Sequence, residues 1–241
     1  MGEIEKNYLI NMEDNLVNQE TIHIEDENFK KVMFLYTSAL KEIKTKIEIL
    51  QEELKLFSDY DPIEYISTRI KKPNSIIKKM ERKKYDLTYE NLFDKINDIA
   101  GIRIVCNFKS DVYKVAEIIE NFQELRVLNK KDFMKKPKKS GYMSYHLIVE
   151  VPVNFSSGIM FIKVEIQIRT LGMDFFASLE HKLKYKNSNI SKNESKNLIK
   201  YAKVINNIDD NMLIISNKME AKRNIMLEAA DNKDDNLNFK I

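Results

Sequence analysis

Glycine is scarce in this sequence: the 241 residues include only five, at positions 2, 101, 141, 158 and 172. P-loops and dinucleotide-binding fingerprints both need several closely spaced glycines, because the backbone must approach the phosphates closely. Neither pattern can be written anywhere in this chain. If the protein binds nucleotides, lysine and arginine side chains must hold the phosphates.

Cysteine and histidine are also rare. The single cysteine, Cys106, excludes a disulfide framework, and three scattered histidines argue against a zinc site. No apolar run approaches the roughly 18 residues of a membrane-spanning helix. The first ten residues mix acidic side chains into what would be the positive region of a signal peptide. We therefore expect a cytoplasmic protein without a membrane partner.

Net charge is small, at +3 from 40 Lys plus Arg and 37 Asp plus Glu, so any affinity for polyanions must come from local clusters. The densest cluster is residues 69–84, with eight Lys or Arg and one Glu. On a helix beginning near Pro73, the side chains that project in one general direction are Ser75, Lys78, Lys79 and Arg82. A triphosphate is an anion of suitable size for this face, and a solvated or RNA-contacting face is the alternative.

Apolar side chains occupy every second position from Met160 to Ile168, which predicts a strand with one buried face. The opposite face carries Glu165, Gln167 and Arg169, spaced about 6.6–6.8 Å apart, so that they line one ligand-sized surface. Asp98 precedes a second predicted strand that contains Arg103. Asp98 could meet Glu165 across the sheet and bind Mg²⁺, which prefers one or two carboxylates with waters and phosphate oxygens. A solvated sheet face and a turn aspartate are the alternatives.

The segment KPKKSGYMSYH, residues 136–146, combines several groups suited to a nucleotide. Its lysines suit phosphates, Gly141 permits a tight backbone path, and a base stacked on Tyr142 would contribute about 1–3 kcal/mol. His146 shares a strand face with Ser144. The alternative is a flexible basic hairpin with a core tyrosine.

Long heptad stripes flank these segments. Apolar residues recur every three or four positions over 29–57 and again over 198–219, which predicts two long amphipathic helices. A Ser191–Glu194 capping-box spacing precedes the second helix. Shorter helices are expected over 89–97, 110–122 and 171–186, strands over 102–108, 124–128, 144–153 and 160–169, and a basic loop over 130–139. We divide the chain into an N-terminal helical extension (1–58), a central domain (59–190), C-terminal helices (191–228) and a flexible tail (229–241).

Four ordered segments closely resemble the synthetase domain of RelA/SpoT enzymes, and specifically the stand-alone small alarmone synthetases. They are RIKKPNSIIKKMERK (69–83), DIAGIRIVCNF (98–108), KPKKSGYMSYHLIVEVP (136–152) and VEIQIRTLGMDFFASLEHKLKYK (164–186). The resemblance implies an α/β (α+β) fold with a mixed sheet of about five strands, flanked by helices and related to nucleotidyltransferases. It also implies transfer of the β,γ-pyrophosphate of ATP to the 3′-hydroxyl of GDP or GTP, giving the alarmones ppGpp or pppGpp.

The resemblance also implies roles for individual residues. The ATP phosphates would be held by Arg69, Lys71, Ser75, Lys78 and Arg82, and adenine would stack on Arg103. Asp98 and Glu165 would ligate Mg²⁺, with Glu165 also the base for the 3′-hydroxyl. Guanine would stack on Tyr142, and the other acceptor contacts would come from Lys138, His146 and Gln167, supported by the charge of Arg169.

The sequence departs from the family at one informative place. Where the family commonly reads NGYRSLH this chain has SGYMSYH, so that Met143 replaces an arginine and the acceptor preference among GMP, GDP and GTP stays open. No His-Asp pair occurs in the chain, and the hydrolase domain of the long family members needs one, so we expect synthesis only. The alternatives are a relative that pyrophosphorylates tRNA 3′ ends or adenine nucleotides, and a non-catalytic RNA-binding regulator. In this family the two heptad helices pair between subunits, commonly as a homotetramer, and single-stranded RNA or an alarmone is a candidate regulator.

Overall fold

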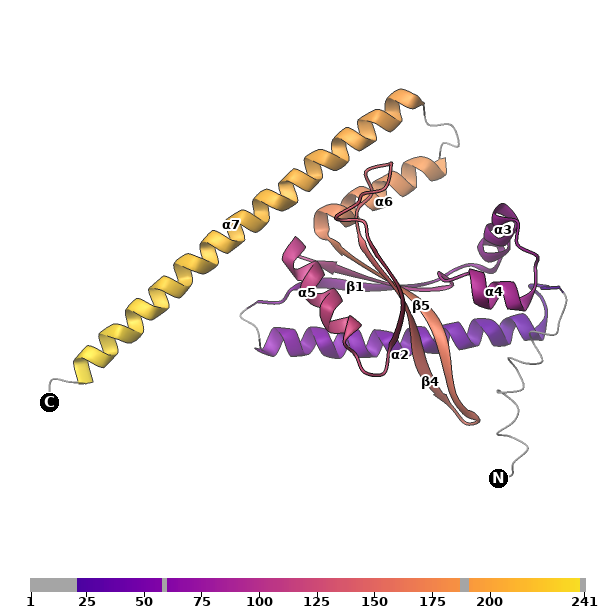
Figure 1. The fold of residues 1–241 in the computed structure, drawn as a ribbon, viewed down its shortest axis with the longest axis horizontal. Helices are drawn as coiled ribbons and strands as arrows, with labels where there is room; N and C mark the ends of the chain where they lie inside the picture. The colour runs from indigo at the N-terminus through magenta and orange to yellow at the C-terminus, as the bar shows by residue number, and fades with distance from the viewer. Residues whose placement is uncertain (1–20, 58–59, 187–190, 239–241) are drawn as a thin grey trace.

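The computed structural model describes residues 21–57, 60–186 and 191–238. Within them, five strands form one mixed sheet in the order β1-β2-β5-β4-β3 (Figure 1). The strands are β1 (Ile63–Ile70), β2 (Ala100–Cys106), β3 (Arg126–Asp132), β4 (Tyr145–Phe155) and β5 (Gly158–Thr170). β2 and β5 run parallel, and the other neighbouring pairs are antiparallel. The mixed five-stranded sheet that the resemblance implied is confirmed.

Helices surround this sheet. They are α2 (Glu27–Phe57), α3 (Pro73–Lys83), α4 (Tyr89–Lys95), α5 (Lys109–Glu120), α6 (Leu171–Lys186) and α7 (Lys192–Asn238). α2 packs across β1, β2, β5 and β4, and α5 packs on β2, β5 and β4. Lys46 of α2 forms an ion pair with Glu124, which follows α5, and buried residues of both helices belong to the same core on this face of the sheet. The opposite face of the central strands is left for polar side chains.

The alternation in β5 decides which side chains reach that polar face. Ile162, Val164, Ile166 and Ile168 are buried in the core, and Glu165 and Gln167 lie between them on the other face. The parallel register pairs Gly101 with Glu165 and Arg103 with Gln167. Side chains of β2 and β5 therefore line the polar face in matching rows, because residues paired across neighbouring strands point to the same side.

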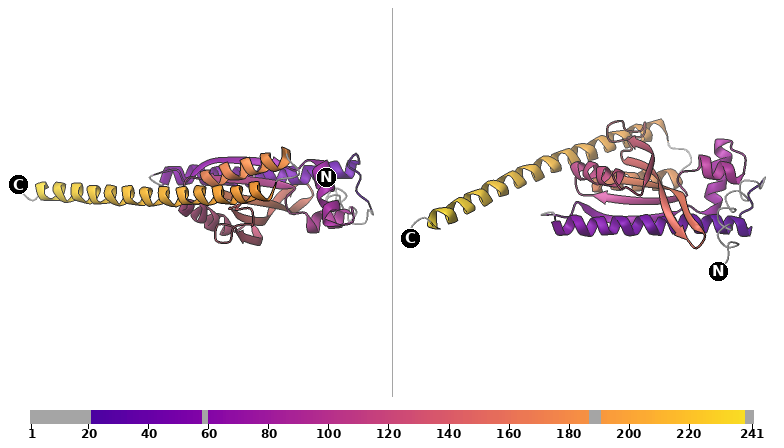
Figure 2. Two further views of the ribbon diagram at one scale, coloured as in Figure 1. Left: turned by 90° about the horizontal axis from the view of Figure 1, so that it is seen from above. Right: turned by 60° about the horizontal axis from the view of Figure 1, so that its bottom comes forward.

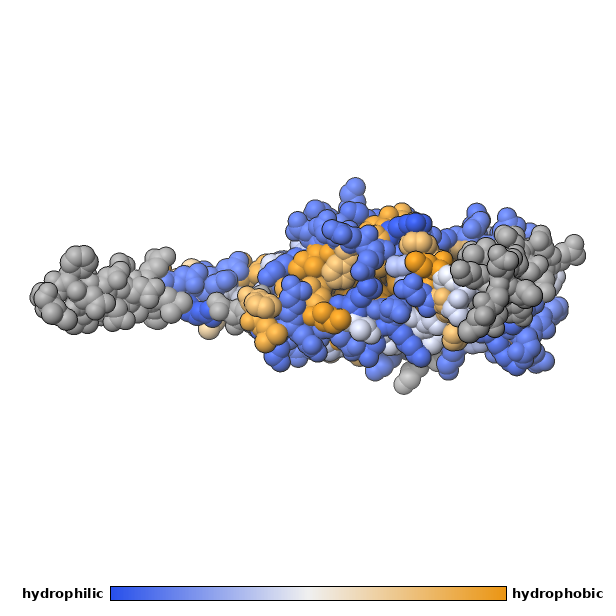
Figure 3. All heavy atoms as spheres, turned by 90° about the horizontal axis from the view of Figure 1, so that it is seen from below, coloured by the Kyte–Doolittle hydropathy of each residue, from blue (hydrophilic) through white to orange (hydrophobic). Residues whose placement is uncertain are grey.

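The heptad stripe of α2 is buried by the chain's own sheet. Its buried positions include Phe29, Tyr36, Ile43, Ile47 and Leu50, and all belong to the hydrophobic core. We expected this stripe to pair between subunits, and the structure corrects that expectation: the apolar face of the sheet covers the stripe. The side of α2 that faces away from the sheet still exposes large hydrophobic side chains, namely Phe34, Ile49, Leu56 and Phe57. Figure 3, which views the body from below, shows hydrophobic side chains gathered on this underside.

α7 differs from α2. It leaves the body and runs as one long helix towards the C-terminus (Figures 1 and 2). The expected capping box is present: Ser191 N donates to Glu194 Oε2 at 2.7 Å, and Glu194 N donates to Ser191 Oγ at 3.2 Å. The helix continues to Asn238, into the range expected to be a flexible tail. The chain has no glycine or proline after Gly172, so no residue of that kind interrupts the helix.

The two edge strands differ most from the sequence prediction. β1 was not predicted, and β3 extends to Asp132, into the residues expected to form a basic loop. Each edge strand has one neighbour and buries few side chains, so its apolar pattern is weak. Residues 1–20 of the expected N-terminal extension and residues 239–241 of the expected tail lie outside the described residues. In the described parts of the chain, no helix is long and apolar enough to cross a membrane.

Candidate active site

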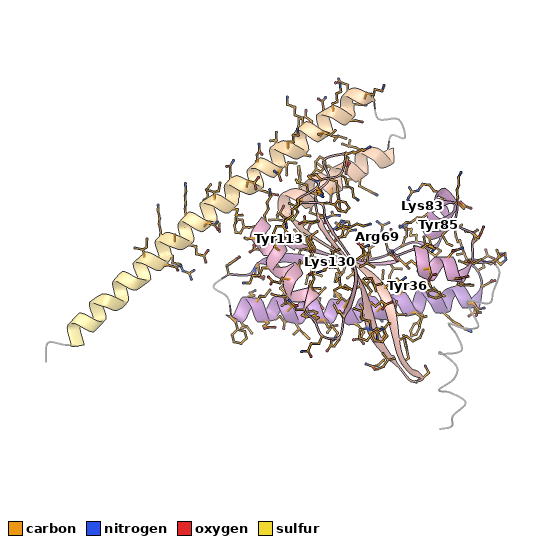
Figure 4. The ribbon with its side chains drawn as sticks, in the orientation of Figure 1. Tyr36, Arg69, Lys83, Tyr85, Tyr113 and Lys130 are labelled. Atoms are coloured by element: carbon orange, nitrogen blue, oxygen red, sulfur yellow. The ribbon has the colours of Figure 1, made fainter. Side chains whose placement is uncertain are left out.

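A cavity of about 400 Å³ opens on the polar face of the sheet. Three strands and the segments that join them line it, with Ser67, Thr68, Arg69, Lys71, Asp98, Gly101, Ile102, Arg103, Glu165 and Gln167. Arg69, at the end of β1, lies on the side of the body that carries α3 (Figure 4). The structure thus brings both predicted carboxylates and two predicted phosphate-binding residues to one cavity.

Two lysines hold Asp98. Lys71 Nζ donates to Asp98 Oδ2 at 2.8 Å, and Lys79 Nζ donates to Oδ1 at 2.7 Å. Burial of Asp98 opposes its ionisation, but the hydrogen bonds from Lys71 and Lys79 outweigh burial and lower the pKa of the carboxyl. Asp98 is therefore an anion between two cations at the entrance to β2.

Neutral side chains hold Glu165. Gln167 Nε2 donates to Glu165 Oε2 at 2.7 Å, and His146 Nδ1 lies 3.3 Å from Oε1. Burial raises the pKa of Glu165, but the hydrogen bonds from His146 and Gln167 outweigh this effect, and the net pKa is lowered. Burial lowers the pKa of His146 in spite of Glu165, which favours a neutral imidazole. The tautomer that suits both contacts carries its proton on Nδ1 and donates it to Glu165.

The remaining acceptor-side residues extend this network. Tyr142 Oη lies 2.9 Å from His146 Nε2 and accepts from Arg169 Nη2 at 2.7 Å. Arg169 Nη2 also donates to Gln167 Oε1 at 2.5 Å. Two chains of hydrogen bonds therefore run from Arg169 to the two oxygens of Glu165, one through Tyr142 and His146 and the other through Gln167. Lys138 Nζ lies 4.6 Å from the centroid of the Tyr142 ring, so all five predicted acceptor residues are neighbours.

The structure does not bring the predicted residues on α3 into the cavity lining. Ser75, Lys78 and Arg82 lie on α3 outside the cavity lining. Lys79, which the helical spacing placed beside Lys78 and which we did not select, is the lysine that reaches Asp98. Adjacent residues on a helix point about 100° apart, so only the tertiary structure shows which of the two faces the site.

Further site residues were missed. Asp174, in the first turn of α6, accepts hydrogen bonds from Tyr65 and Arg169 and forms an ion pair with Arg103. Its sequence signal was weak, because an acidic residue in the first turn of a helix is ordinarily explained by the helix dipole. Ser67 and Thr68 belong to the unpredicted strand β1, and so their place in the lining could not be foreseen.

The donor atoms in the cavity suit magnesium. Two carboxylates, Asp98 and Glu165, face the same space, and the described residues contain no group of three or more His, Cys, Asp or Glu that could hold a metal. Mg²⁺ commonly takes one or two carboxylates and fills its other positions with waters and phosphate oxygens. A pair of carboxylates beside lysine and arginine side chains fits the preference of Mg²⁺ better than that of zinc.

Residues 68–190 match the model of the region found in RelA/SpoT proteins, and this range contains every residue of the cavity lining except Ser67. The chain belongs to the RelA/SpoT family. It is 39% identical over 195 residues to the GTP pyrophosphokinase YwaC of Bacillus subtilis, covering 80% of this chain and 93% of that protein. It is 33% identical over 198 residues to the GTP pyrophosphokinase YjbM of the same organism, covering 82% and 92%.

The fold agrees with the family assignment. The structure superposes with a TM-score of 0.75 on small alarmone synthetase 1 from Bacillus subtilis, bound to its product pppGpp. The two chains are 34% identical, and the match covers 80% of this chain and 98% of the other. The resemblance to the small alarmone synthetases stated from the four motifs is confirmed.

Met143, the departure from the common RelA/SpoT motif, lies in a contact with α7. It is buried and lines a second cavity of about 400 Å³ between residues 134–143 and α7, together with Ile199 and Ala202. Gly141 adopts a φ of 85°, and a Cβ there would lie 2.5 Å from the Cβ of Ala202. Residues 134–143 therefore pack directly against α7, and an apolar side chain at position 143 suits that packing.

Proposed function

We propose that this chain is a GTP pyrophosphokinase that transfers the β,γ-pyrophosphate of ATP to the 3′-hydroxyl of GDP or GTP, making ppGpp or pppGpp. The observation that carries this proposal is the cavity in which Asp98 and Glu165 meet. Lysines and arginines border it on one side and the Tyr142 network borders it on the other. Such a site can bind a donor triphosphate and a nucleotide acceptor at once.

In this proposal Glu165 receives the proton of the acceptor's 3′-hydroxyl. In the proposed step the 3′-oxygen bonds to the β-phosphorus of ATP, the bond from that phosphorus to the α,β-bridging oxygen breaks, and AMP leaves. The 3′-hydroxyl proton passes to Glu165, whose lowered pKa keeps the carboxylate ready as a base at neutral pH. Phosphoryl-type transfer depends mainly on alignment and charge neutralisation, which the surrounding cations provide.

The donor side is built from cations. Arg69 and Lys71 line the cavity and would hold the ATP phosphates, with Ser75, Lys78 and Arg82 extending this surface along α3. Lys79 joins them, because it already binds a carboxylate in the cavity. Arg103 would stack on adenine. Asp98 and Glu165 would hold Mg²⁺, which when bound supplies charge neutralisation of the phosphates.

The acceptor side is built around an aromatic ring. Guanine would stack on Tyr142, which has Lys138 and Arg169 nearby, at 4.6 Å and 5.1 Å from its ring centroid. Lys138, His146, Gln167 and Arg169 would contact the phosphates, ribose or base. Because cations already lie near this ring, an anionic nucleotide would meet favourable charge there.

An acceptor panel tests this function. The purified chain would be incubated with labelled ATP, magnesium and one acceptor at a time: GMP, GDP, GTP, ATP or tRNA. We expect labelled product with GDP and GTP and loss of all product when EDTA removes the metal. Transfer to tRNA or to ATP alone would instead indicate one of the related activities, and no transfer with ATP binding intact would contradict the proposal.

Synthesis without hydrolysis is part of the proposal. The chain lacks the His-Asp pair of the family's hydrolase domain. Purified protein incubated with ppGpp and manganese should therefore release no pyrophosphate. Release above a no-protein control would contradict this part of the assignment.

We also propose that α7 mediates assembly, with a homotetramer as the expected state. In the single chain, four apolar residues of α7 are each at least half exposed to solvent: Ile208, Met212, Ile215 and Met219. Light scattering on a sizing column should give a mass about four times 28.5 kDa. An Ile215→Asp variant should reduce that mass and keep its circular dichroism, whereas a wild-type mass of one chain would contradict the proposal. Regulation by RNA or by an alarmone stays a prediction.

A further inference from the structure

One buried carboxylate on α6 contacts three neighbouring strands. Asp174 is only 7% exposed. Its Oδ1 lies 3.1 Å from Arg103 Nη1 of β2 and accepts from Arg169 Nη1 of β5 at 3.0 Å. Its Oδ2 accepts from the Tyr65 hydroxyl of β1 at 2.7 Å. A single side chain thus joins strands β1, β2 and β5 above the polar face of the sheet.

The two arginines belong to different halves of the site. Arg103 lines the cavity assigned to the donor. Arg169 donates to Tyr142 and Gln167, which lead by hydrogen bonds to Glu165. Asp174 is therefore one contact away from the adenine platform on one side and from the acceptor network on the other. No other described carboxylate forms an ion pair with either arginine.

The charge of Asp174 is needed where it lies. Two guanidinium groups approach the same oxygen atom, and like charges at such a separation repel unless an anion lies between them. The Arg169 side chain is 5% exposed, so water screens little of this repulsion. The Nε atoms of both arginines are buried without a hydrogen-bond partner among the described residues, which leaves Asp174 as a principal anchor for both groups.

We propose that Asp174 is a positioning residue that orients Arg103 and Arg169 together, so that donor binding and acceptor binding both depend on a side chain that touches neither substrate. This inference rests on the proposed function, because it uses the assigned roles of the two arginines. A carboxylate that only anchored α6 to the sheet would affect stability and leave the two substrate affinities independent of its charge.

The first test is the substitution Asp174→Asn, which keeps the shape of the side chain and removes its charge. We expect KM to rise about tenfold for ATP and also for GDP, because Arg103 loses an ion pair and Arg169 loses a charge-assisted hydrogen bond. The matched control is Tyr65→Phe, which removes a hydrogen bond to the same carboxylate and leaves both arginines paired. Its two KM values should stay within about twofold of wild type. Unchanged KM values in Asp174→Asn would overturn the proposal.

A double-mutant cycle separates positioning from a general loss of structure. In the wild-type background Arg103→Ala should raise only the KM for ATP, by about tenfold. In the Asp174→Asn background the same change should add less than about threefold, since Asp174 acts through Arg103. If Arg103→Ala raised the KM for ATP by the same factor in both backgrounds, the two residues would act independently, and this result would contradict the proposal.

A second variant covers the case in which Asp174→Asn does not fold. Asp174→Glu keeps the charge and moves it by one methylene, so it should fold and still raise both KM values; unchanged values would overturn the proposal. The wild-type enzyme measured in parallel separates the two levels of inference. Absence of product from wild type contradicts the proposed function, whereas wild-type turnover with unaffected variants contradicts only the role of Asp174.

Discussion

Asp98 and Glu165 line the same cavity but have different partners. Asp98 is held by two lysine side chains, which can also bind the phosphates of a donor. Glu165 is held by Gln167 and by a histidine whose lowered pKa favours its neutral form. The two lysines could therefore leave Asp98 and bind the phosphates of a ligand if a metal ion were bound to the carboxylate. The partners of Glu165 keep its position in the absence of ligands.

This contrast predicts the largest effect for Glu165, which in the proposed function serves both as a metal ligand and as the base. Glu165→Gln should lower kcat by about a thousandfold or more. The matched control is Glu150→Gln, the same change on neighbouring β4, where Glu150 lies 3.9 Å from Arg126 and outside the cavity. Product formation from labelled ATP and GDP measures both. Near-normal kcat in Glu165→Gln would show that Glu165 is not the base.

Asp98 should matter less, because in the proposed function it would contribute only to metal binding. We expect Asp98→Asn to lower activity by about a hundredfold at low magnesium and to recover part of it as magnesium is raised. Activity measured across a magnesium titration tests this difference. Glu165→Gln should show no such recovery, and equal responses of the two variants would remove the distinction between the carboxylates.

The partners of Asp98 provide a sharper test on adjacent residues. Lys79→Ala should raise the KM for ATP by about tenfold, because its ammonium group binds Asp98, which lines the cavity. Lys78→Ala is the comparison and should raise this KM less, since Lys78 is exposed on α3 and lies outside the cavity lining. Initial rates over a range of ATP concentrations compare the two. A larger rise in KM for Lys78→Ala than for Lys79→Ala would support the prediction from sequence that Lys78 holds the ATP phosphates, and it would contradict the orientation of α3.

The smallest effect is expected in the network behind Glu165. Tyr142→Phe keeps the ring for stacking and removes the hydroxyl that joins Arg169 to His146. We expect kcat to fall by about threefold, because one neutral hydrogen bond is lost and Gln167 still holds Glu165. Tyr145→Phe is the matched control, since its hydroxyl donates to Glu120 outside this network. Equal kcat values for the two variants would exclude a role for the Tyr142 hydroxyl in orienting Glu165.

Central and edge strands show how far the sequence could predict the fold. The alternation over 160–169 identified β5 and its polar face, because a central strand buries one full row of side chains. β1 contributes Arg69 to the site, yet as an edge strand it buries few residues and left no clear pattern. A weakly buried strand is specified mainly by pairing with its neighbour, and that pairing is not visible in a single segment.

The two heptad stripes make the same point about helices. Both predicted long helices, and both helices exist. The stripe of α2 is covered by the chain's own sheet, and that of α7 remains exposed in the single chain. A periodic apolar face shows that a helix needs a covering surface, but it carries no information about which surface that is.

The sequence by itself determined the family, the central strands, the long helices and most of the residues that meet in the site, because these depend on local patterns and ordered motifs. The tertiary structure alone decided that Lys79 rather than Lys78 reaches Asp98, that Asp174 joins Arg103 to Arg169, and that α7 packs on the acceptor segment. Each of these facts depends on the orientation of one element against another. Such orientations follow from the packing of residues far apart in the chain, which no local pattern encodes.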